Sequence, residues 1–163
     1  MRMQRIVFQT VWPFRQCRPG LFLRPGDQRT IPIMAIRIVR LGSPRAPDEG
    51  LRLGTVRRPP RGVRREDIAA RNFYDVWVPG VAPTEVLLKQ GQRAVDDERR
   101  WKMFARAYQR EMKRPDAARL LDLLAALSHG TDFSVGCYCE DESRCHRSLL
   151  RRLLQERGAA FVR

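Results

Sequence analysis

Residues 133–154 decide the fold, and they read FSVGCYC (133–139), EDESR (140–144) and CHRSLLRRLL (145–154). The first part is a short apolar run, which predicts a buried strand. In the third part four leucines fall on one face of a helix: Leu149, Leu150, Leu153 and Leu154. A strand, a polar loop and a helix in this order are typical of an α/β domain, in which ligands bind beyond the carboxyl ends of the strands.

The segments upstream supply the other strands. Alternating apolar residues or short aromatic and β-branched runs predict strands at 35–40, 51–56 and 73–78, beside the strand at 132–139. A chain of 163 residues has the length of one core. The sequence therefore predicts a single compact α/β domain over residues 34–163, with a mainly parallel sheet flanked by helices.

Helical spacing is clearest before the last strand. An apolar stripe predicts a helix over residues 97–113, and it consists of Trp101, Phe104, Tyr108 and Met112. A second helix is expected to begin at Pro115 and to end with a glycine cap at Gly130, so that the two form a helical hairpin. A short helix over 64–71 and a helix capped by the Thr84 hydroxyl are also expected.

Residues 1–33 differ from the rest of the chain. Prolines and glycines interrupt this segment, and arginine recurs through it. The regular alternation of a strand begins only after Met34. We therefore interpret residues 1–33 as a basic extension, either disordered or the product of an upstream start codon.

The composition favours a negatively charged partner. The net charge is +14, from 32 lysines and arginines against 18 aspartates and glutamates, and such a chain attracts anionic small molecules or nucleic acid. Nearly all of this charge is arginine, however, which a GC-rich gene would explain equally well. No apolar run is long enough to cross a bilayer and no signal peptide is evident, so we expect a cytoplasmic protein without a membrane contact.

Three of the four cysteines lie within nine residues, next to a histidine and an arginine. A cysteine at a helix N-terminus beside basic residues has a lowered pKa and is nucleophilic at neutral pH. Cys145 fits this description best, with His146 as a base and Arg147 binding a substrate anion. We therefore predict Cys145 and His146 as catalytic residues, although adjacent residues at a helix start need not face each other.

Two other interpretations remain open for the same residues. Cys137, Cys139, Cys145 and His146 are the right number and type of ligands for tetrahedral zinc, but their spacing differs from the usual paired C-x2–4-C knuckles. Alternatively, Cys137 and Cys139 only pack in the core, as free cysteines often do. The main hypothesis needs no cofactor, and zinc is the alternative.

The segment RRPPRG (57–62) is a further candidate for ligand binding. Its prolines cannot continue a central strand, so it predicts a stiff exposed loop. Arg57 and Arg61 on such a loop could bind an anion together with Arg147. A solvated turn is an equally good interpretation.

These motifs together resemble a bacterial family catalogued as domain of unknown function 488. The resemblance covers residues 35–158 and rests on V-R-R-P-P-R-G-V (56–63), Trp77 with Ala82-Pro83-Thr84, the aromatic helix and C-Y-C-x5-C-H-R (137–147). It implies a small single-domain α/β protein and no established reaction. Many members have an acidic residue and a tryptophan where this chain has Val56 and Pro59, so no carboxylate function is expected there.

The sequence thus gives one leading functional hypothesis and two alternatives. The leading hypothesis is a small enzyme that acts on an anionic ligand, a nucleotide or nucleic acid, through a Cys-His-Arg site. The alternatives are a non-enzymatic basic protein that binds nucleic acid, and an interaction module stabilised by zinc.

Overall fold

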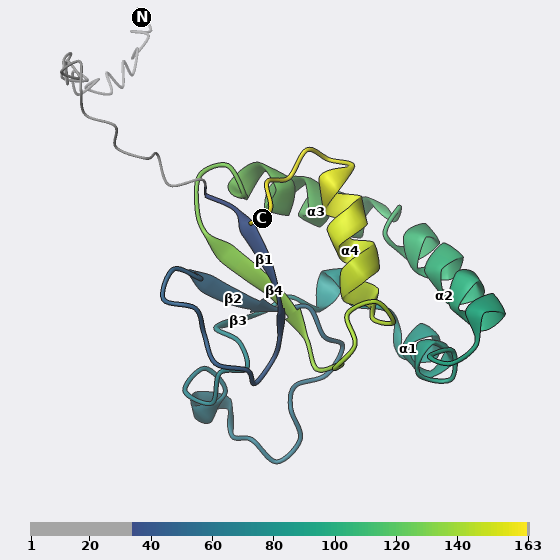
Figure 1. Ribbon diagram of the computed structural model, residues 1–163, viewed down its shortest axis with the longest axis horizontal. Coiled ribbons are helices and arrows are strands. Elements are labelled where there is room, and N and C mark those ends of the chain that lie inside the picture. Colours follow the sequence, from purple (N-terminus) through teal and green to yellow (C-terminus); the bar gives the residue numbers. More distant parts are fainter. Residues whose placement is uncertain (1–33, 163) are drawn as a thin grey trace, which may run out of the picture. The chain divides into compact units, whose positions relative to one another are not determined.

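The computed structural model describes residues 34–162 and contains one parallel sheet (Figure 1). Its strands are β1 (Ile36–Arg40), β2 (Leu51–Gly54), β3 (Val76–Trp77) and β4 (Phe133–Cys137). Their order is β1-β4-β2-β3, and all neighbouring pairs are parallel. The predicted α/β class with a parallel sheet is therefore confirmed, and β4 lies between β1 and β2.

Three helices lie between β3 and β4 in the sequence, α1 (Glu85–Gln92), α2 (Glu98–Glu111) and α3 (Pro115–Leu127), and α4 (His146–Gln155) follows β4. Two 3-10 turns are also present, η1 (Arg65–Asp67) and η2 (Pro79–Val81). The apolar faces of the helices pack in one core with alternate residues of the strands, which are Ile36, Leu53, Phe133 and Val135. The helices accordingly gather on one side of the sheet in Figure 1.

The other face of the sheet holds a buried ion pair. The guanidinium of Arg52 is fully buried and donates two hydrogen bonds to the Glu49 carboxylate, at 2.6 and 2.7 Å. It also donates to the carbonyl oxygens of Ser43 and Asn72, and Ser134 donates to Glu49. Because a buried charge is costly without partners, these contacts fix the loops on this face to β2 and β4.

Several predicted boundaries are wrong. The strand expected at 51–56 ends at Gly54, and the one at 73–78 is reduced to Val76–Trp77. The helix expected at 64–71 is only the 3-10 turn η1. Asn72, in the left-handed region with φ of 59°, turns the chain just after this segment. From the sequence, the presence of a short apolar element is predicted more reliably than the residues at which it begins and ends.

The predicted helix caps are also wrong, although the helices themselves are confirmed. Thr84 precedes α1 but its hydroxyl donates to the carboxylate of Glu111 instead of accepting from the helix. Gly130 does not have a positive φ, and α3 ends at Leu127 with Ser128 as its C-cap. The expected hairpin is absent among the described residues, because α2 packs on α1 and α4, and α3 packs on α4 and η2.

The last described residues return to the sheet. Phe161 forms a parallel bridge with Ile36, and the Ile36 N–H donates to the Ala160 carbonyl. This segment therefore pairs with β1 at the edge of the sheet. No helix in residues 34–162 has the length and apolar character needed to cross a membrane. The prediction of a basic extension concerns residues 1–33, which lie outside the described part of the chain.

Candidate functional site

The candidate site lies at the carboxyl edge of the sheet, after its central strand. Cys137 is the last residue of β4, Cys139 follows two residues later, and Cys145 is the N-cap of α4. The loop between them closes with a hydrogen bond from the Cys145 N–H to the Glu142 carbonyl. The predicted strand, loop and helix thus bring the three thiols to one place.

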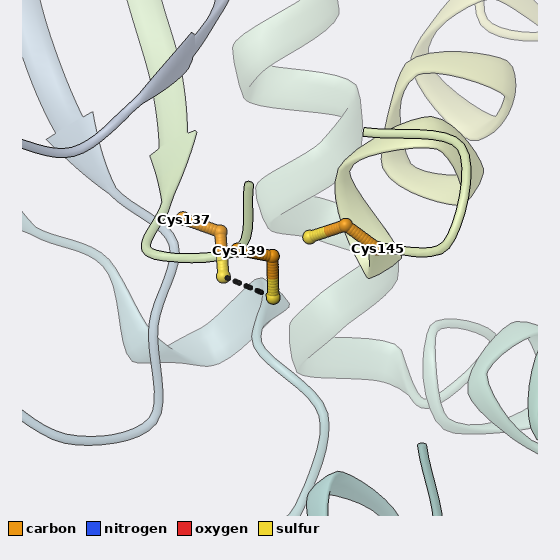
Figure 2. A group of neighbouring side chains, drawn as sticks. All are labelled: Cys137, Cys139 and Cys145. Atoms are coloured by element: carbon orange, nitrogen blue, oxygen red, sulfur yellow. Dashed lines mark hydrogen bonds between the residues drawn. The ribbon is translucent and has the colours of Figure 1, made fainter. Parts of the chain in front are cut away.

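The three sulfur atoms face one another (Figure 2). The Sγ atoms of Cys137 and Cys139 are 3.7 Å apart, and the sulfur of Cys145 completes a group whose members all lie within 4.8 Å. Cys137 and Cys145 are buried, whereas Cys139 is exposed. The group therefore reaches the surface through Cys139.

The His146 ring is held in one orientation. Its Nε2 atom lies 2.8 Å from the carbonyl oxygen of Thr55, which can only accept a hydrogen bond. In neutral imidazole the hydrogen is therefore on Nε2, and Nδ1 has the free lone pair. Nδ1 lies 3.7 Å from the sulfur of Cys145. Cys145 and His146 therefore face each other, although the sequence did not require this.

The thiols differ in acidity because they share hydrogen bonds. Hydrogen bonds from Cys137 and Cys139 hold the pKa of Cys145 below its usual value, although burial acts against this. The pKa of Cys137 is raised, because hydrogen bonding with the sulfurs of Cys139 and Cys145 stabilises its neutral thiol and because burial disfavours a thiolate. The first negative charge of the group is therefore stabilised on Cys145.

Arg147 fixes the loop and does not line a ligand site. Its side chain is buried, and its two Nη atoms donate to the carbonyl oxygens of Val39 at 2.7 Å and Cys139 at 2.6 Å. The Nε atom has no hydrogen-bond partner among the described residues. Because both Nη atoms donate to backbone carbonyls of the protein itself, Arg147 connects the end of β1 to the loop between Cys139 and Cys145.

A cavity of about 580 Å³ opens beside the thiols. Cys137, Cys139 and His146 form part of its wall, whereas Cys145 lies behind them and is only 2% exposed. A volume of this size suits a small organic ligand. A ligand in the cavity would meet Cys139 and His146 before it could reach the sulfur of Cys145.

Most charged groups on the cavity wall are positive. Arg57 donates to the carbonyl oxygens of Ala82 and Pro83, and Arg58 forms an ion pair with Glu85. Arg61 and Lys89 make no hydrogen bond or ion pair through their side chains with residues 34–162. Within residues 34–162, Arg61 is therefore the predicted loop arginine whose guanidinium has no protein partner.

Lys89 and Tyr138 are site residues that the sequence did not reveal. Lys89 comes from α1, far along the chain from the cysteines, and no local pattern distinguishes it from a solvated lysine. Tyr138 stands within the C-Y-C motif itself, and its ring packs edge-on against Phe73, with 6.0 Å between the centroids. The position of Tyr138 between two candidate site cysteines was the feature of the sequence that could have identified it as a site residue.

The comparisons with known proteins agree with the resemblance noted in the sequence. A family model described as DUF488-N3a, active DUF488-N3 subclade, matches residues 36–158. No curated protein and no solved structure matches the chain.

Proposed function

The chain belongs to the DUF488-N3a family, and on that premise we propose that it is a small enzyme acting on an anionic ligand of nucleotide type. The family description calls the subclade active and names no reaction. The substrate class is therefore inferred from the cavity. The observation that carries the proposal is that two cations without a partner in residues 34–162 (Arg61 and Lys89), an aromatic wall, and the side chains of Cys139 and His146 all border one cavity.

The charge of the cavity favours an anion. Arg57, Arg58, Arg61 and Lys89 line it together with a single carboxylate, Glu85, which is already paired with Arg58. Charge-assisted hydrogen bonds from guanidinium to phosphate are among the stronger polar contacts. Arg61 and Lys89 therefore supply the positive charge for a phosphate group.

The uncharged part of the wall favours a planar group on the same ligand. Phe73 and Tyr138 border the cavity with Val56, Pro59, Pro60 and Leu88. Bases of nucleotides stack on aromatic side chains and pack on apolar ones. A ligand with a phosphate for the cationic part of the wall and a base for the aromatic and apolar part therefore fits the cavity. Such a ligand is a free nucleotide or the end of a nucleic acid.

The test is direct binding of AMP and of a short single-stranded oligonucleotide, measured by calorimetry at fixed salt. We expect AMP to bind, and Arg61→Ala to weaken it by about tenfold, because one charge-assisted hydrogen bond is lost. Arg119→Ala is the matched control, since Arg119 is exposed on α3 and does not line the cavity. Binding of the oligonucleotide but not of AMP would assign the site to nucleic acid.

Equal losses from Arg61→Ala and Arg119→Ala would contradict the proposal and would favour the alternative of a basic protein that binds polyanions with its whole surface. A catalytic function requires a second measurement. After incubation with AMP or the oligonucleotide, mass spectrometry should detect a changed ligand with the wild-type protein and an unchanged one with Cys139→Ser.

A further inference from the structure

The three thiols are arranged in a way that core packing does not explain. Cys137 and Cys145 are buried, but the exposed Cys139 also places its sulfur beside the other two (Figure 2). A buried cysteine usually packs against apolar groups and needs no second thiol. Three sulfurs within 4.8 Å of one another instead resemble the donor set of a soft metal ion.

The distances fit one face of a zinc tetrahedron. With Zn–S bonds of about 2.3 Å, two sulfurs on the same ion lie about 3.8 Å apart. The sulfurs of Cys137 and Cys139 are 3.7 Å apart, and Cys145 closes the face within 4.8 Å. Shortening the longest sulfur–sulfur separation by about 1 Å at most, which side-chain rotation allows, would bring all three edges to the zinc value.

The surroundings supply the outer contacts that a thiolate site needs. Zinc with three thiolates has a net charge of −1, and the Arg147 guanidinium lies beside it, donating to the carbonyl of Cys139. That contact also fixes the loop that separates the ligands. Groups around a metal's own ligands orient them in this way. Arg147, predicted to bind a substrate anion, thus has a structural reason to be buried here.

We propose that Cys137, Cys139 and Cys145 bind one zinc ion. His146, the fourth ligand of the zinc alternative, faces Cys145 but lies outside the group of atoms within 4.8 Å. Three protein ligands and one open position are typical of zinc sites that act on a ligand, whereas four ligands are typical of structural ones. That the open position faces the cavity ligand rests on the proposed function, but the three-sulfur site does not.

The first test is the metal content of the full chain purified without chelator. Elemental analysis should find about one equivalent of zinc, and protein reconstituted with Co²⁺ should show the absorption of tetrahedral cobalt bound to thiolate. Less than a tenth of an equivalent of zinc, combined with no cobalt spectrum, would overturn the proposal. An equivalent of iron or copper in place of zinc would overturn the choice of metal.

Variants then locate the site. Cys139→Ser should reduce the zinc content at least tenfold, and because Cys139 is exposed, the circular dichroism of the fold should remain. Cys17→Ser is the matched control, since it removes the fourth cysteine of the chain. Unchanged zinc in Cys139→Ser, or equal loss in Cys17→Ser, would show that the metal lies elsewhere.

The two proposals fail in different ways. If the metal is absent but AMP still binds in a manner that depends on Arg61, the zinc site is wrong and the anion site stands. If zinc binds to the three cysteines but neither AMP nor the oligonucleotide binds, the zinc site stands and its open position serves another ligand.

Discussion

At the scale of single residues, solvent exposure is a better guide than the pKa to which of the three cysteines can react with a ligand. Cys145 has the lowered pKa expected of it, through hydrogen bonds from Cys137 and Cys139, yet its side chain is only 2% exposed. A nucleophile has to touch its substrate, and Cys139 is the thiol that reaches solvent. The prediction of Cys145 as an attacking thiol therefore fits the structure less well than its proposed role as a metal ligand.

This difference can be measured by alkylation. In metal-free protein at neutral pH, iodoacetamide should label Cys139 first, because Cys139 is the exposed thiol of the three and reaction needs access to the sulfur. Peptide mass spectrometry at short times identifies the labelled residue. Faster labelling of Cys145 than of Cys139 would restore Cys145 as the nucleophile, and added zinc should slow the labelling of all three.

Glu49 gives a second prediction at this scale. Burial alone would raise its pKa, but hydrogen bonds from Arg52, Ser134 and the Ala46 N–H outweigh burial and lower it. A carboxyl whose pKa is lower in the folded state stabilises the fold above its unfolded pKa of about 4.3. That stabilisation is lost as the pH falls through the folded pKa.

Glu49→Gln should therefore lower the free energy of unfolding at pH 7 by about 3–5 kcal/mol, because Arg52 would keep a buried charge without its partner. Urea unfolding at pH 7 and at pH 3.5 measures the effect. The difference in the free energy of unfolding between wild type and variant should be smaller at pH 3.5 than at pH 7. An equal difference at both pH values would show that the charge of Glu49 does not stabilise the fold.

At the scale of elements, the tight approach of β2 to the loop after η1 depends on a glycine. A Cβ added to Gly54 would lie 2.4 Å from the ring of Tyr74, which is itself buried. Gly54→Ala should therefore lower the free energy of unfolding by about 1–3 kcal/mol, as overpacked core positions do. Gly130→Ala is the control for urea unfolding, since a Cβ there meets nothing within 4 Å and the change should stay within about 0.5 kcal/mol. Equal effects of the two substitutions would show that the contact with Tyr74 does not matter.

The elements also show how far the sequence could predict this protein. The central segment from Phe133 to Leu154 was predicted correctly, because its strand, loop and helix follow from local patterns of apolar residues. The ion pair of Arg52 was missed although Glu49 is only three residues away, because strand alternation does not show that this face of the sheet is buried. Lys89 was missed because α1 brings it to a cavity whose wall is formed by distant segments, and local patterns contain no information on such contacts. The cap expected at Thr84 was wrong for the same reason, since Glu111, on α2, takes its hydroxyl.

At the scale of the whole molecule, the net charge of +14 predicts binding to nucleic acid that depends on salt. If Arg61 and Lys89 neutralise two phosphates of a single strand, the logarithm of affinity should fall with the logarithm of salt with a slope of about −1.4. Arg61→Ala should reduce this slope by about 0.7. Fluorescence anisotropy of a labelled oligonucleotide at several salt concentrations provides the slope. A much steeper slope that Arg61→Ala leaves unchanged would indicate contacts over the general surface.

The strand order β1-β4-β2-β3 has a consequence for how the protein is made. β1 and β2 are synthesised early, but the strand that joins them is β4, which follows the end of β2 by about 80 residues. At translation rates of about 5–20 residues per second, roughly 4–16 s pass between the synthesis of β2 and that of β4, the strand that pairs with both β1 and β2. During that interval both strands have unpaired edges that attract other chains. Chaperone demand during translation should therefore be greatest just before the cysteine-bearing strand emerges from the ribosome.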